Sequence, residues 1–371
     1  MADNPELVAL RNQIDEVDQQ IHRLLNKRAE CAKQVADVKL KEFEEQNGQV
    51  DLSQVKFYRP EREAQVLQKV MDRNEGPLAD KTVAHLFREI MSACLALEKP
   101  MEVAFLGPDG TFTHAAALKH FGHAVVSLSQ TTIADVFSQV ESGQCLYGVV
   151  PVENSTEGMV NHTLDNFVDS SLKICGEVEL RIHHHLLVSE QTPAEKVTRI
   201  CAHQQALAQC RQWLDVNWPD VERVAVSSNG EAAKMAVETP GVAAIAGELA
   251  ADKYGLMKLA ENIEDLSNNA TRFLIIGREV IPPSGKDKTS IVVSTHNKPG
   301  ALFNLLDHFR KAGVSLTRLD TRPSRTQNWA YVFFIEFEGH EKDEKIGKVL
   351  KGLEEESILL KPLGSYPKAV L

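Results

Sequence analysis

A hydroxyl and a fixed cation stand side by side in the segment 266–273, which reads Leu-Ser-Asn-Asn-Ala-Thr-Arg-Phe. The apolar run 274–277 follows this segment and is typical of a buried strand. Because ligands of open α/β sheets bind at strand ends, Thr271 and Arg272 are candidate site residues. Asn and Thr are also ordinary turn residues, so this segment alone favours a capped turn without chemical function.

A second polar segment follows the strand predicted over 102–106. It reads Gly-Pro-Asp-Gly-Thr over 107–111 and precedes a predicted helix. Glycines allow backbone N–H groups to approach a ligand, and a helix N-terminus favours an anion. Thr111 is therefore a candidate for the same site, although a threonine here can equally be a simple helix cap.

A third polar segment ends the apolar run 146–152, where Asn154 and Ser155 offer uncharged donors and acceptors. Strands and helices alternate around these segments, which indicates an α/β domain. We expect two lobes with a cleft between them, and a chain that crosses between the lobes near Arg181 and again near Glu264.

The N-terminal part is predicted to be helical. Apolar residues between Leu7 and Leu25 recur at spacings of three and four, which predicts an amphipathic helix from Pro5 to about Leu40. Two more helices are expected near 60–74 and 78–98. A first helix of this length is expected to pack against other long helices.

Cations on this first helix could share a site. Arg28 and Lys39 are separated by eleven positions, which places them about 20° apart around the helix, whereas Arg11 lies about 100° from Arg28. Arg11 could reach the pair only from a partner chain related by a two-fold axis. The alternative is that all three are solvated surface cations.

Length and composition limit the remaining classes. A chain of 371 residues predicts two or three domains, and a net charge of -11 argues against a nucleic-acid or membrane-surface binder. The six cysteines form no C-x-x-C pair. The start is polar and no apolar run approaches the ~20 residues of a membrane span, so we expect a soluble, cytoplasmic protein. The triplet His183-His-His185 alternates sides in a strand and is not expected to bind metal.

The C-terminal part follows a linker at 282–287. Between 289 and 363 the patterns predict the order strand, helix, strand, strand, helix, strand. This order is that of a ferredoxin-like fold.

Six short segments of the helical part carry a resemblance to a known family. They are Leu7-Val-Ala-Leu-Arg11, Ile14-Asp-Glu-Val-Asp18, Leu24-Leu-Asn-Lys-Arg28, Val38-Lys39, Pro60-Glu-Arg-Glu63 and Leu86-Phe87. Together they resemble the all-helical chorismate mutase family over residues 5 to 98. In that family each active site is built across an intertwined helical dimer. The resemblance implies that Arg11 of the partner, Arg28 and Lys39 bind the substrate carboxylates and ether oxygen, that Arg62 supports the charge, and that Glu63 holds the ring hydroxyl.

Glu98 matches a position of this family that is held by Gln or Glu. A carboxylate cannot donate a hydrogen bond to the ether oxygen, so we expect Glu98 to be protonated, with a pKa well above the ordinary value of about 4.3. Mutase activity is then expected to fall as the pH rises.

The central segments resemble prephenate dehydratase over residues 102 to 280, through Gly107-Pro-Asp-Gly-Thr-Phe-Thr113, Val150-Pro-Val-Glu-Asn-Ser155 and Ala270-Thr-Arg-Phe273. The resemblance implies a two-lobed fold like that of small-molecule-binding proteins. Thr271 would be the main catalytic residue, hydrogen-bonding the departing hydroxyl or relaying a proton. The residues lining the site would be Thr111, Asn154, Ser155 and Arg272.

The C-terminal segments Pro299-Gly-Ala-Leu302 and Leu319-Asp-Thr-Arg-Pro323 resemble the phenylalanine-binding ACT module. The resemblance implies an amino-acid site where two modules meet, and feedback inhibition by L-phenylalanine. Gly300 could instead merely start the helix. The implied effector-binding residues are Gly300, Ala301, Leu302, Asp320, Thr321 and Arg322.

These readings predict a multidomain protein with a helical mutase module (1–98), a two-lobed α/β dehydratase domain (101–282) and an α+β regulatory module (288–371). The resemblance implies an enzyme of phenylalanine biosynthesis that rearranges chorismate to prephenate and converts prephenate to phenylpyruvate. It implies no cofactor or metal, no nucleic-acid or membrane partner, and a homodimer or higher oligomer. One alternative is a dehydratase with a merely dimerising helical module, because the loop 41–57 is long and Arg59 and Cys94 depart from the usual residues. The other is an amino-acid sensor without catalysis.

Overall fold

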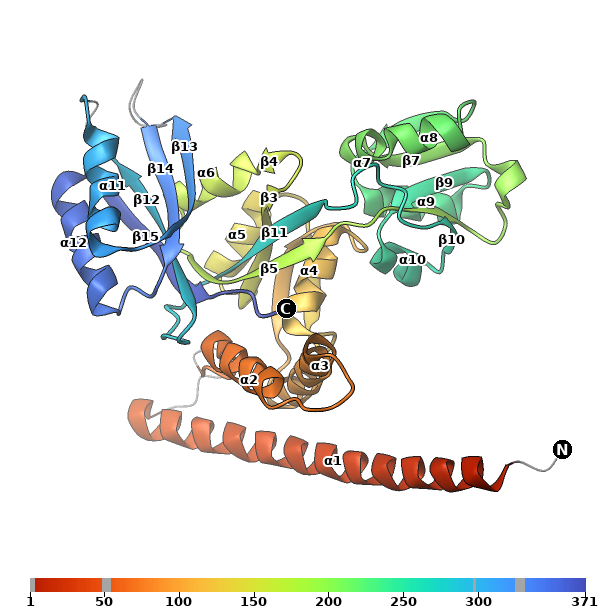
Figure 1. Ribbon diagram of the computed structural model, residues 1–371, viewed down its shortest axis with the longest axis horizontal. Coiled ribbons are helices and arrows are strands. Elements are labelled where there is room, and N and C mark those ends of the chain that lie inside the picture. Colours follow the sequence, from red (N-terminus) through yellow and green to blue (C-terminus); the bar gives the residue numbers. More distant parts are fainter. Residues whose placement is uncertain (1–3, 49–54, 296–297, 324–330) are drawn as a thin grey trace.

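The computed structural model describes residues 4–48, 55–295, 298–323 and 331–371. Figure 1 shows a helical module at the N-terminus, a two-lobed α/β domain, and a C-terminal module of one sheet and two helices. The expected fold class is therefore confirmed. None of the helices in the described ranges has the length and apolar character to cross a bilayer.

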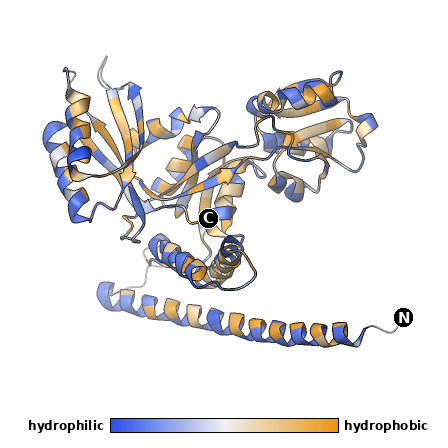
Figure 2. Cartoon of the chain, in the orientation of Figure 1, coloured by the Kyte–Doolittle hydropathy of each residue, from blue (hydrophilic) through white to orange (hydrophobic). Residues whose placement is uncertain are grey.

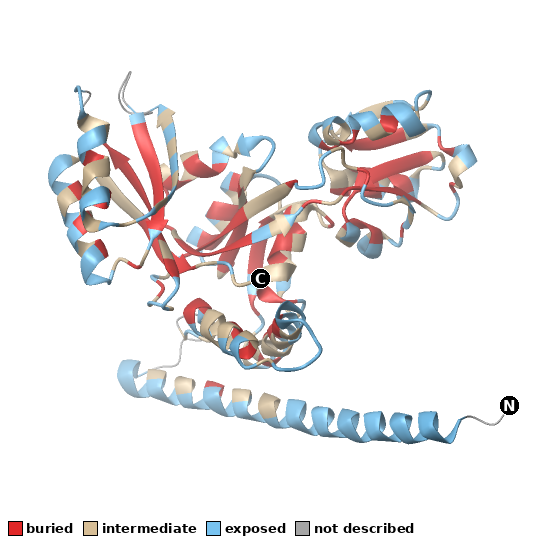
Figure 3. Ribbon diagram, viewed as in Figure 1, coloured by how far each residue is buried: buried red, intermediate tan, exposed pale blue. Residues whose placement is uncertain are grey.

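The helical module contains α1 (Pro5–Asn47), α2 (Pro60–Asp72) and α3 (Asp80–Glu98). Helix α1 runs beyond the expected end and stops at Gly48, whose φ of 76° is a left-handed conformation and whose N–H bonds to the Glu44 carbonyl. Helices α2 and α3 pack together, and α1 packs against α3. The N-terminal half of α1 leaves its apolar stripe uncovered, with Ile14 59 % and Leu24 65 % exposed (Figures 2 and 3).

The first lobe of the α/β domain is a sheet in the order β2-β1-β3-β11-β5, with β4 paired to β3. Strand β11 returns to this lobe late in the chain and runs antiparallel between β3 and β5. The elements of this lobe are β1 (Glu102–Leu106), α4 (Phe112–Phe121), β2 (Val126–Gln130), α5 (Ile133–Glu141), β3 (Tyr147–Asn154), β4 (Gly158–Met159), α6 (Asn161–Asp169), β5 (Lys173–Arg181) and β11 (Ala270–Gly277).

The second lobe is a sheet in the order β10-β6-β9-β7-β8. The chain crosses between lobes after β5 and after β10, as the sequence predicted. At these crossings the Glu264 carboxylate accepts from the His184 backbone N–H (2.9 Å) and lies 2.8 Å from His183 Nδ1. The elements are β6 (His185–Val188), β7 (Arg199–His203), α7 (Gln204–Gln209), α8 (Arg211–Asn217), β8 (Glu222–Val226), α9 (Asn229–Glu238), β9 (Val242–Ala246), α10 (Glu248–Tyr254) and β10 (Met257–Ala260), with a 3-10 turn at Ala194–Lys196.

The C-terminal module is ferredoxin-like, as predicted, with sheet order β13-β14-β12-β15. One face of its sheet packs on its two helices, and the other face joins the apolar core of the first lobe through Val292, Phe334 and Tyr366. The elements are β12 (Asp287–Ser294), α11 (Ala301–Ala312), β13 (Leu316–Pro323), β14 (Tyr331–Glu338), α12 (Glu344–Glu356) and β15 (Leu359–Pro367).

Candidate functional sites

The structure brings Arg28, Lys39 and Glu98 together in the helical module. Burial raises the pKa of the Glu98 carboxyl, while Lys39 and Arg28 lie close enough to oppose this shift. Lys39 Nζ donates to the Phe57 carbonyl at 3.0 Å. Glu98 Oε2 is buried and has no hydrogen-bond partner among the described residues. Two cations and a carboxyl with an unused oxygen therefore face one region.

The other predicted residues of this site lie apart from that group. Arg11 precedes Arg28 by seventeen positions on the same straight helix, which separates them by about 26 Å. Arg62 is exposed on α2. The Glu63 carboxylate accepts from Arg88 Nε at 3.1 Å, and Arg88 also donates to the carbonyl of Lys119 in α4 at 2.9 Å. Glu63 thus lies where the helical module meets the first lobe.

Thr271 and Asn154 face each other at the ends of β11 and β3. Asn154 Nδ2 donates to Thr271 Oγ1 at 2.8 Å and to Asn269 Oδ1 at 2.9 Å. Asn154 Oδ1 accepts from Thr156 Oγ1 at 2.6 Å and from the Thr156 backbone N–H at 3.0 Å, which fixes the orientation of the amide. Since Thr271 Oγ1 accepts from Asn154, its own hydrogen is left to donate to another group.

The two remaining uncharged residues make structural bonds. Ser155 Oγ accepts from the Ala270 N–H at 3.0 Å and lies 3.4 Å from Asn269 Oδ1, so it belongs to the Asn154 group. Thr111 is the N-cap of α4, accepting from the His114 N–H and donating to the Leu106 carbonyl. The helix cap that the sequence allowed is therefore present, and no described contact joins Thr111 to Thr271.

The segment 107–111 nevertheless reaches the second lobe. Tyr254 Oη of α10 donates to the Asp109 carbonyl at 3.2 Å. A Cβ added to Gly230, in α9, would lie 2.6 Å from the same carbonyl oxygen, so this close approach of backbone requires glycine there. The loop of Thr111 thus connects the two lobes.

Three residues that were not predicted as site residues, Asn269, Gln209 and His184, extend the Asn154 group into the second lobe. Asn269 Nδ2 donates to Gln209 Oε1 at 3.1 Å, and His184 Nε2 donates to the same oxygen at 2.9 Å. The signal for Asn269 was present, because a residue two positions before Thr271 shares its side of the chain. Beside the group lies a cavity of about 330 Å³ lined by residues that include Thr156, Gln209, Arg211, Glu264 and Asn269.

The histidine triplet does not lie in one strand as predicted, because β6 begins only at His185, but its members have three different sets of partners. His183 pairs with Glu264, His184 with Gln209, and His185 Nδ1 accepts from the Asn262 N–H at 3.2 Å. Within the described ranges no group of three or more His, Cys, Asp or Glu could hold a metal ion.

The structure does not bring Arg272 to the Thr271 group. Its guanidinium lies on the other side of β11, where Nη2 is 2.6 Å from Glu177 and also pairs with Glu336 of the C-terminal module. The physical reason is strand geometry, since neighbouring residues of a strand point to opposite faces.

The predicted effector residues lie at one end of the C-terminal sheet. Ser294 at the end of β12 and Arg322 near the end of β13 both pair with Val332 of β14, and Gly300 starts α11 with a φ of 80°. Ala301 and Leu302 form the first turn of that helix, and Thr321 is exposed. Arg322 pairs with Asp165 of the first lobe at 3.0 Å, and Asp320 Oδ2 is buried without a hydrogen-bond partner in the described part of the chain.

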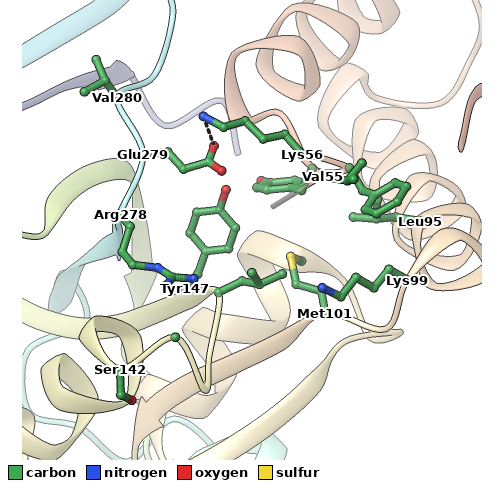
Figure 4. A pocket seen from close by; sticks show the side chains of 14 residues that line it. Val55, Lys56, Leu95, Lys99, Met101, Ser142, Tyr147, Arg278, Glu279 and Val280 are labelled. Carbon is green, nitrogen blue, oxygen red and sulfur yellow. Dashed lines mark ion pairs between the residues drawn. The ribbon is translucent and has the colours of Figure 1, made fainter. Parts of the chain in front are cut away.

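A cavity of about 780 Å³ lies between the segment 55–58, the end of α3 and the first lobe. Figure 4 shows the Tyr147 hydroxyl pointing toward the ion pair of Lys56 and Glu279, whose atoms are 3.4 Å apart. None of the predicted site residues lines this cavity, although Phe57, whose carbonyl binds Lys39, forms part of its wall.

Three family models match the chain in sequence order. Chorismate mutase type II matches residues 10–99, prephenate dehydratase matches 103–280, and the ACT domain matches 289–355. The bifunctional chorismate mutase/prephenate dehydratase of Pseudomonas aeruginosa is 57% identical over 371 residues, covering 100% of both chains.

Two solved structures resemble the part of the chain that follows the helical module. The prephenate dehydratase of Arthrobacter aurescens in complex with L-Phe is 35% identical with a TM-score of 0.67, and the match covers 72% of this chain and 90% of that one. A quorum quenching acylase is 29% identical with the same TM-score, covering 72% of this chain and 98% of the acylase.

The fold and the two residue groups define a protein that joins a helical mutase module, a two-lobed dehydratase domain and an ACT module in one chain. The chain belongs to the family of bifunctional chorismate mutase/prephenate dehydratases.

Proposed function

We propose that this protein rearranges chorismate to prephenate in the helical module and converts prephenate to phenylpyruvate in the two-lobed domain. The observation that supports this most is the presence of both predicted groups in one chain: Arg28, Lys39 and Glu98 in the first, Asn154 and Thr271 in the second. The acylase of the same fold is one reason to test the substrates directly. The route is that of phenylalanine biosynthesis, and we place it in the cytoplasm.

The test supplies chorismate and follows prephenate and phenylpyruvate separately, with and without phenylalanine. We expect both products. Prephenate supplied alone should give phenylpyruvate. A chain that consumes prephenate but not chorismate would be a dehydratase with a dimerising helical module, and a chain that consumes neither would be a sensor. A chelator is expected to change neither rate.

The mutase step needs no nucleophile, because the rearrangement is unimolecular. The protein has only to hold a compact conformer and to place donors where negative charge grows on the ether oxygen. Lys39 and Arg28 supply cationic donors, and Glu98 Oε2, which is unpartnered in the described structure, supplies an O–H when protonated. Arg11 of a partner chain and Arg62 are proposed to bind carboxylates, and Glu63 the ring hydroxyl.

The raised pKa of Glu98 predicts that mutase activity depends on pH. Burial raises its pKa, so the protonated, donating form persists to a higher pH than for an ordinary glutamic acid. Mutase kcat/KM is therefore expected to be highest below this pKa and to fall as the pH rises through it. Glu98→Gln, which donates at every pH, should flatten this fall. The pH profiles of both proteins provide the measurement, and a wild-type profile without a fall would contradict the role.

The dehydratase step removes carbon dioxide and the ring hydroxyl of prephenate, and the new aromatic ring supplies much of the driving force. Thr271 is proposed to donate its free hydrogen to the departing hydroxyl, because Asn154 already occupies its acceptor side. Asn154 thus orients the hydroxyl, Ser155 holds the two strand ends together, and Thr111 is proposed to contact the substrate from the loop between the lobes.

The exposed stripe of α1 supports assembly as a homodimer or higher oligomer. Leu10, Ile14, Val17 and Leu24 are each more than half exposed, and a stripe of this kind marks an interaction surface. An antiparallel α1 from a second chain would cover it and bring Arg11 toward Arg28 and Lys39.

Ile14→Asp tests this assembly. A charge in the contact is expected to shift the protein to smaller species in sedimentation and to lower mutase activity at least about tenfold, since an interface charge without a partner is strongly unfavourable. Glu16→Lys, on the same helix, is the control. Unchanged sedimentation of Ile14→Asp would contradict an interface at this stripe.

Phenylalanine is proposed to bind the ACT module through the residues Gly300, Ala301, Leu302, Asp320, Thr321 and Arg322, and to inhibit the dehydratase step. The related dehydratase whose structure contains L-Phe supports this assignment. Inhibition requires that phenylalanine bind two states of the protein with different affinity.

A further inference from the structure

The catalytic ends of β3 and β11 form a ladder with two different faces. The register pairs Thr271 with Asn154 and, one position further, Arg272 with Glu153. Because side chains alternate along a strand, the first pair faces the dehydratase group and the second pair faces away from it. The ladder then shifts register between Arg272 and Phe273, and such a bulge re-aims the side chains beside it.

Both residues on the second face are held by the C-terminal module. Arg272 pairs with Glu336 of β14, and its Nη2 lies 3.3 Å from the Tyr366 hydroxyl of β15. Glu153 pairs with Arg318 of β13. The strand positions directly beside Asn154 and Thr271 are therefore each tied to a strand of the other module.

The Arg272 side of this contact is a closed set of charges. Lys288 of β12 lies 3.0 Å from Glu177 and 3.2 Å from Glu336, and Arg272 contacts the same two carboxylates. Two cations thus meet two anions, with all four side chains less than a fifth exposed. Burial disfavours ionised Glu336, but Arg272 and Lys288 outweigh burial and lower the pKa of Glu336 to about 2. Removal of one member leaves the set with one uncompensated buried charge.

The Glu153 side leads to a predicted effector residue. Arg318 Nε lies 3.9 Å from Asp320 Oδ2, and this buried oxygen has no hydrogen-bond partner in the described part of the chain. Burial raises the pKa of Asp320, and the charges of Arg318, Glu153, Glu336 and Arg272 all act on it. A ligand cation near Asp320 would compete with Arg318 for this carboxylate.

We propose that Arg272 and Glu153 are positioning residues, through which Glu336 and Arg318 of the C-terminal module hold the Thr271 and Asn154 ladder in its working geometry. An amino-acid effector that draws Asp320 or Arg318 away from this arrangement lowers dehydratase turnover by displacing the ladder. This inference rests on the proposed function and deepens its regulation.

The test exchanges the charges of one pair. Glu153→Arg, Arg318→Glu and the double variant are assayed as full chains with prephenate, with chorismate, and with prephenate plus phenylalanine. Each single variant is expected to lose about tenfold to a hundredfold in dehydratase kcat, with KM within about threefold, because a small displacement of catalytic groups affects turnover more than binding. The double variant restores the attraction between positions 153 and 318, so turnover should recover to within about threefold of wild type, but it places a carboxylate beside Asp320, so inhibition by phenylalanine should stay weakened.

The controls separate positioning from folding. Mutase activity in the same chain should stay within about twofold in the Glu153 and Arg318 variants, since the described side-chain contacts of these two residues are with the first lobe and the C-terminal module and not with the helical module. Glu344→Lys with Lys348→Glu exchanges a highly exposed pair of the same module and should leave all three readouts unchanged. A single variant that also loses mutase activity is replaced by a milder probe, Glu336→Gln. This variant should lower dehydratase kcat and leave mutase activity unchanged, and Glu338→Gln is its control.

Two outcomes would overturn the inference: single variants with wild-type turnover and inhibition, or a double variant no better than the worse single variant. Both are distinct from a failure of the proposed function, in which the wild-type protein itself would not consume prephenate.

Discussion

Thr271→Val is expected to lower dehydratase kcat by about a hundredfold to a thousandfold, the range found when one preorganised donor to a developing charge is removed. Valine keeps the shape and the strand preference of threonine, so β11 should remain intact. The variant loses the hydroxyl that accepts from Asn154 at 2.8 Å and that donates to the departing group. Steady-state kinetics with purified prephenate measure the effect.

Two comparisons make this result specific. Thr271→Ser retains the hydroxyl and should stay within about tenfold of wild type, because only the constraint on the side chain is lost. Mutase activity of Thr271→Val with chorismate should be that of wild type. Retention of more than about a third of the dehydratase turnover by a folded Thr271→Val would remove Thr271 from the catalytic role.

The order and class of the modules could be predicted because each has its own periodicity. Spacings of three and four identified α1, and the strand and helix order between 289 and 363 identified the C-terminal module. The end of α1 was placed seven residues too early, because its last seven residues contain Phe43 as their single apolar residue, and the stop signal was Gly48.

The placement of Arg272 could also have been predicted. The argument of alternation that was applied to the histidine triplet also places Thr271 and Arg272 on opposite faces of β11, where it holds, whereas only His185 of the triplet lies in a strand. No local sequence pattern shows which residues pair with Arg272, because Glu336 and Glu177 come from strands distant in sequence. The sequence predicts the C-terminal sheet as an independent module, yet the face of this sheet opposite its two helices completes the apolar core of the first lobe.

The contacts of Glu63 and Gln209 could not be predicted from local sequence patterns either. The pairing of Glu63 with Arg88 depends on how α2 and α3 dock on α4, and Arg88 contributes by binding the Lys119 carbonyl. Gln209 lies at the end of α7 in the second lobe and reaches Asn269 only because the two lobes approach each other. Tertiary packing, which has no sequence period, decides both contacts.

Lys39→Ala is expected to lower mutase kcat/KM by at least about a hundredfold to a thousandfold, because it removes a cationic donor from a region where negative charge grows on the ether oxygen. Lys39 Nζ is held in place by the Phe57 carbonyl, to which it donates at 3.0 Å. The loss also removes one of the two cations that oppose protonation of Glu98, so the pKa of Glu98 should rise further. Initial rates of chorismate consumption across pH measure both effects.

Two variants separate the charge of Lys39 from its geometry. Lys39→Arg retains the charge but not the compact ammonium and should still lose most of the activity, because a planar guanidinium cannot occupy the same point. Lys33→Ala, an exposed lysine of the same helix, should retain wild-type rates. Dehydratase activity with supplied prephenate should stay within about twofold in all three. A folded Lys39→Ala protein with mutase activity within tenfold of wild type would show that the ammonium does not have this role, whereas a parallel loss of both activities would show that Lys39 serves folding.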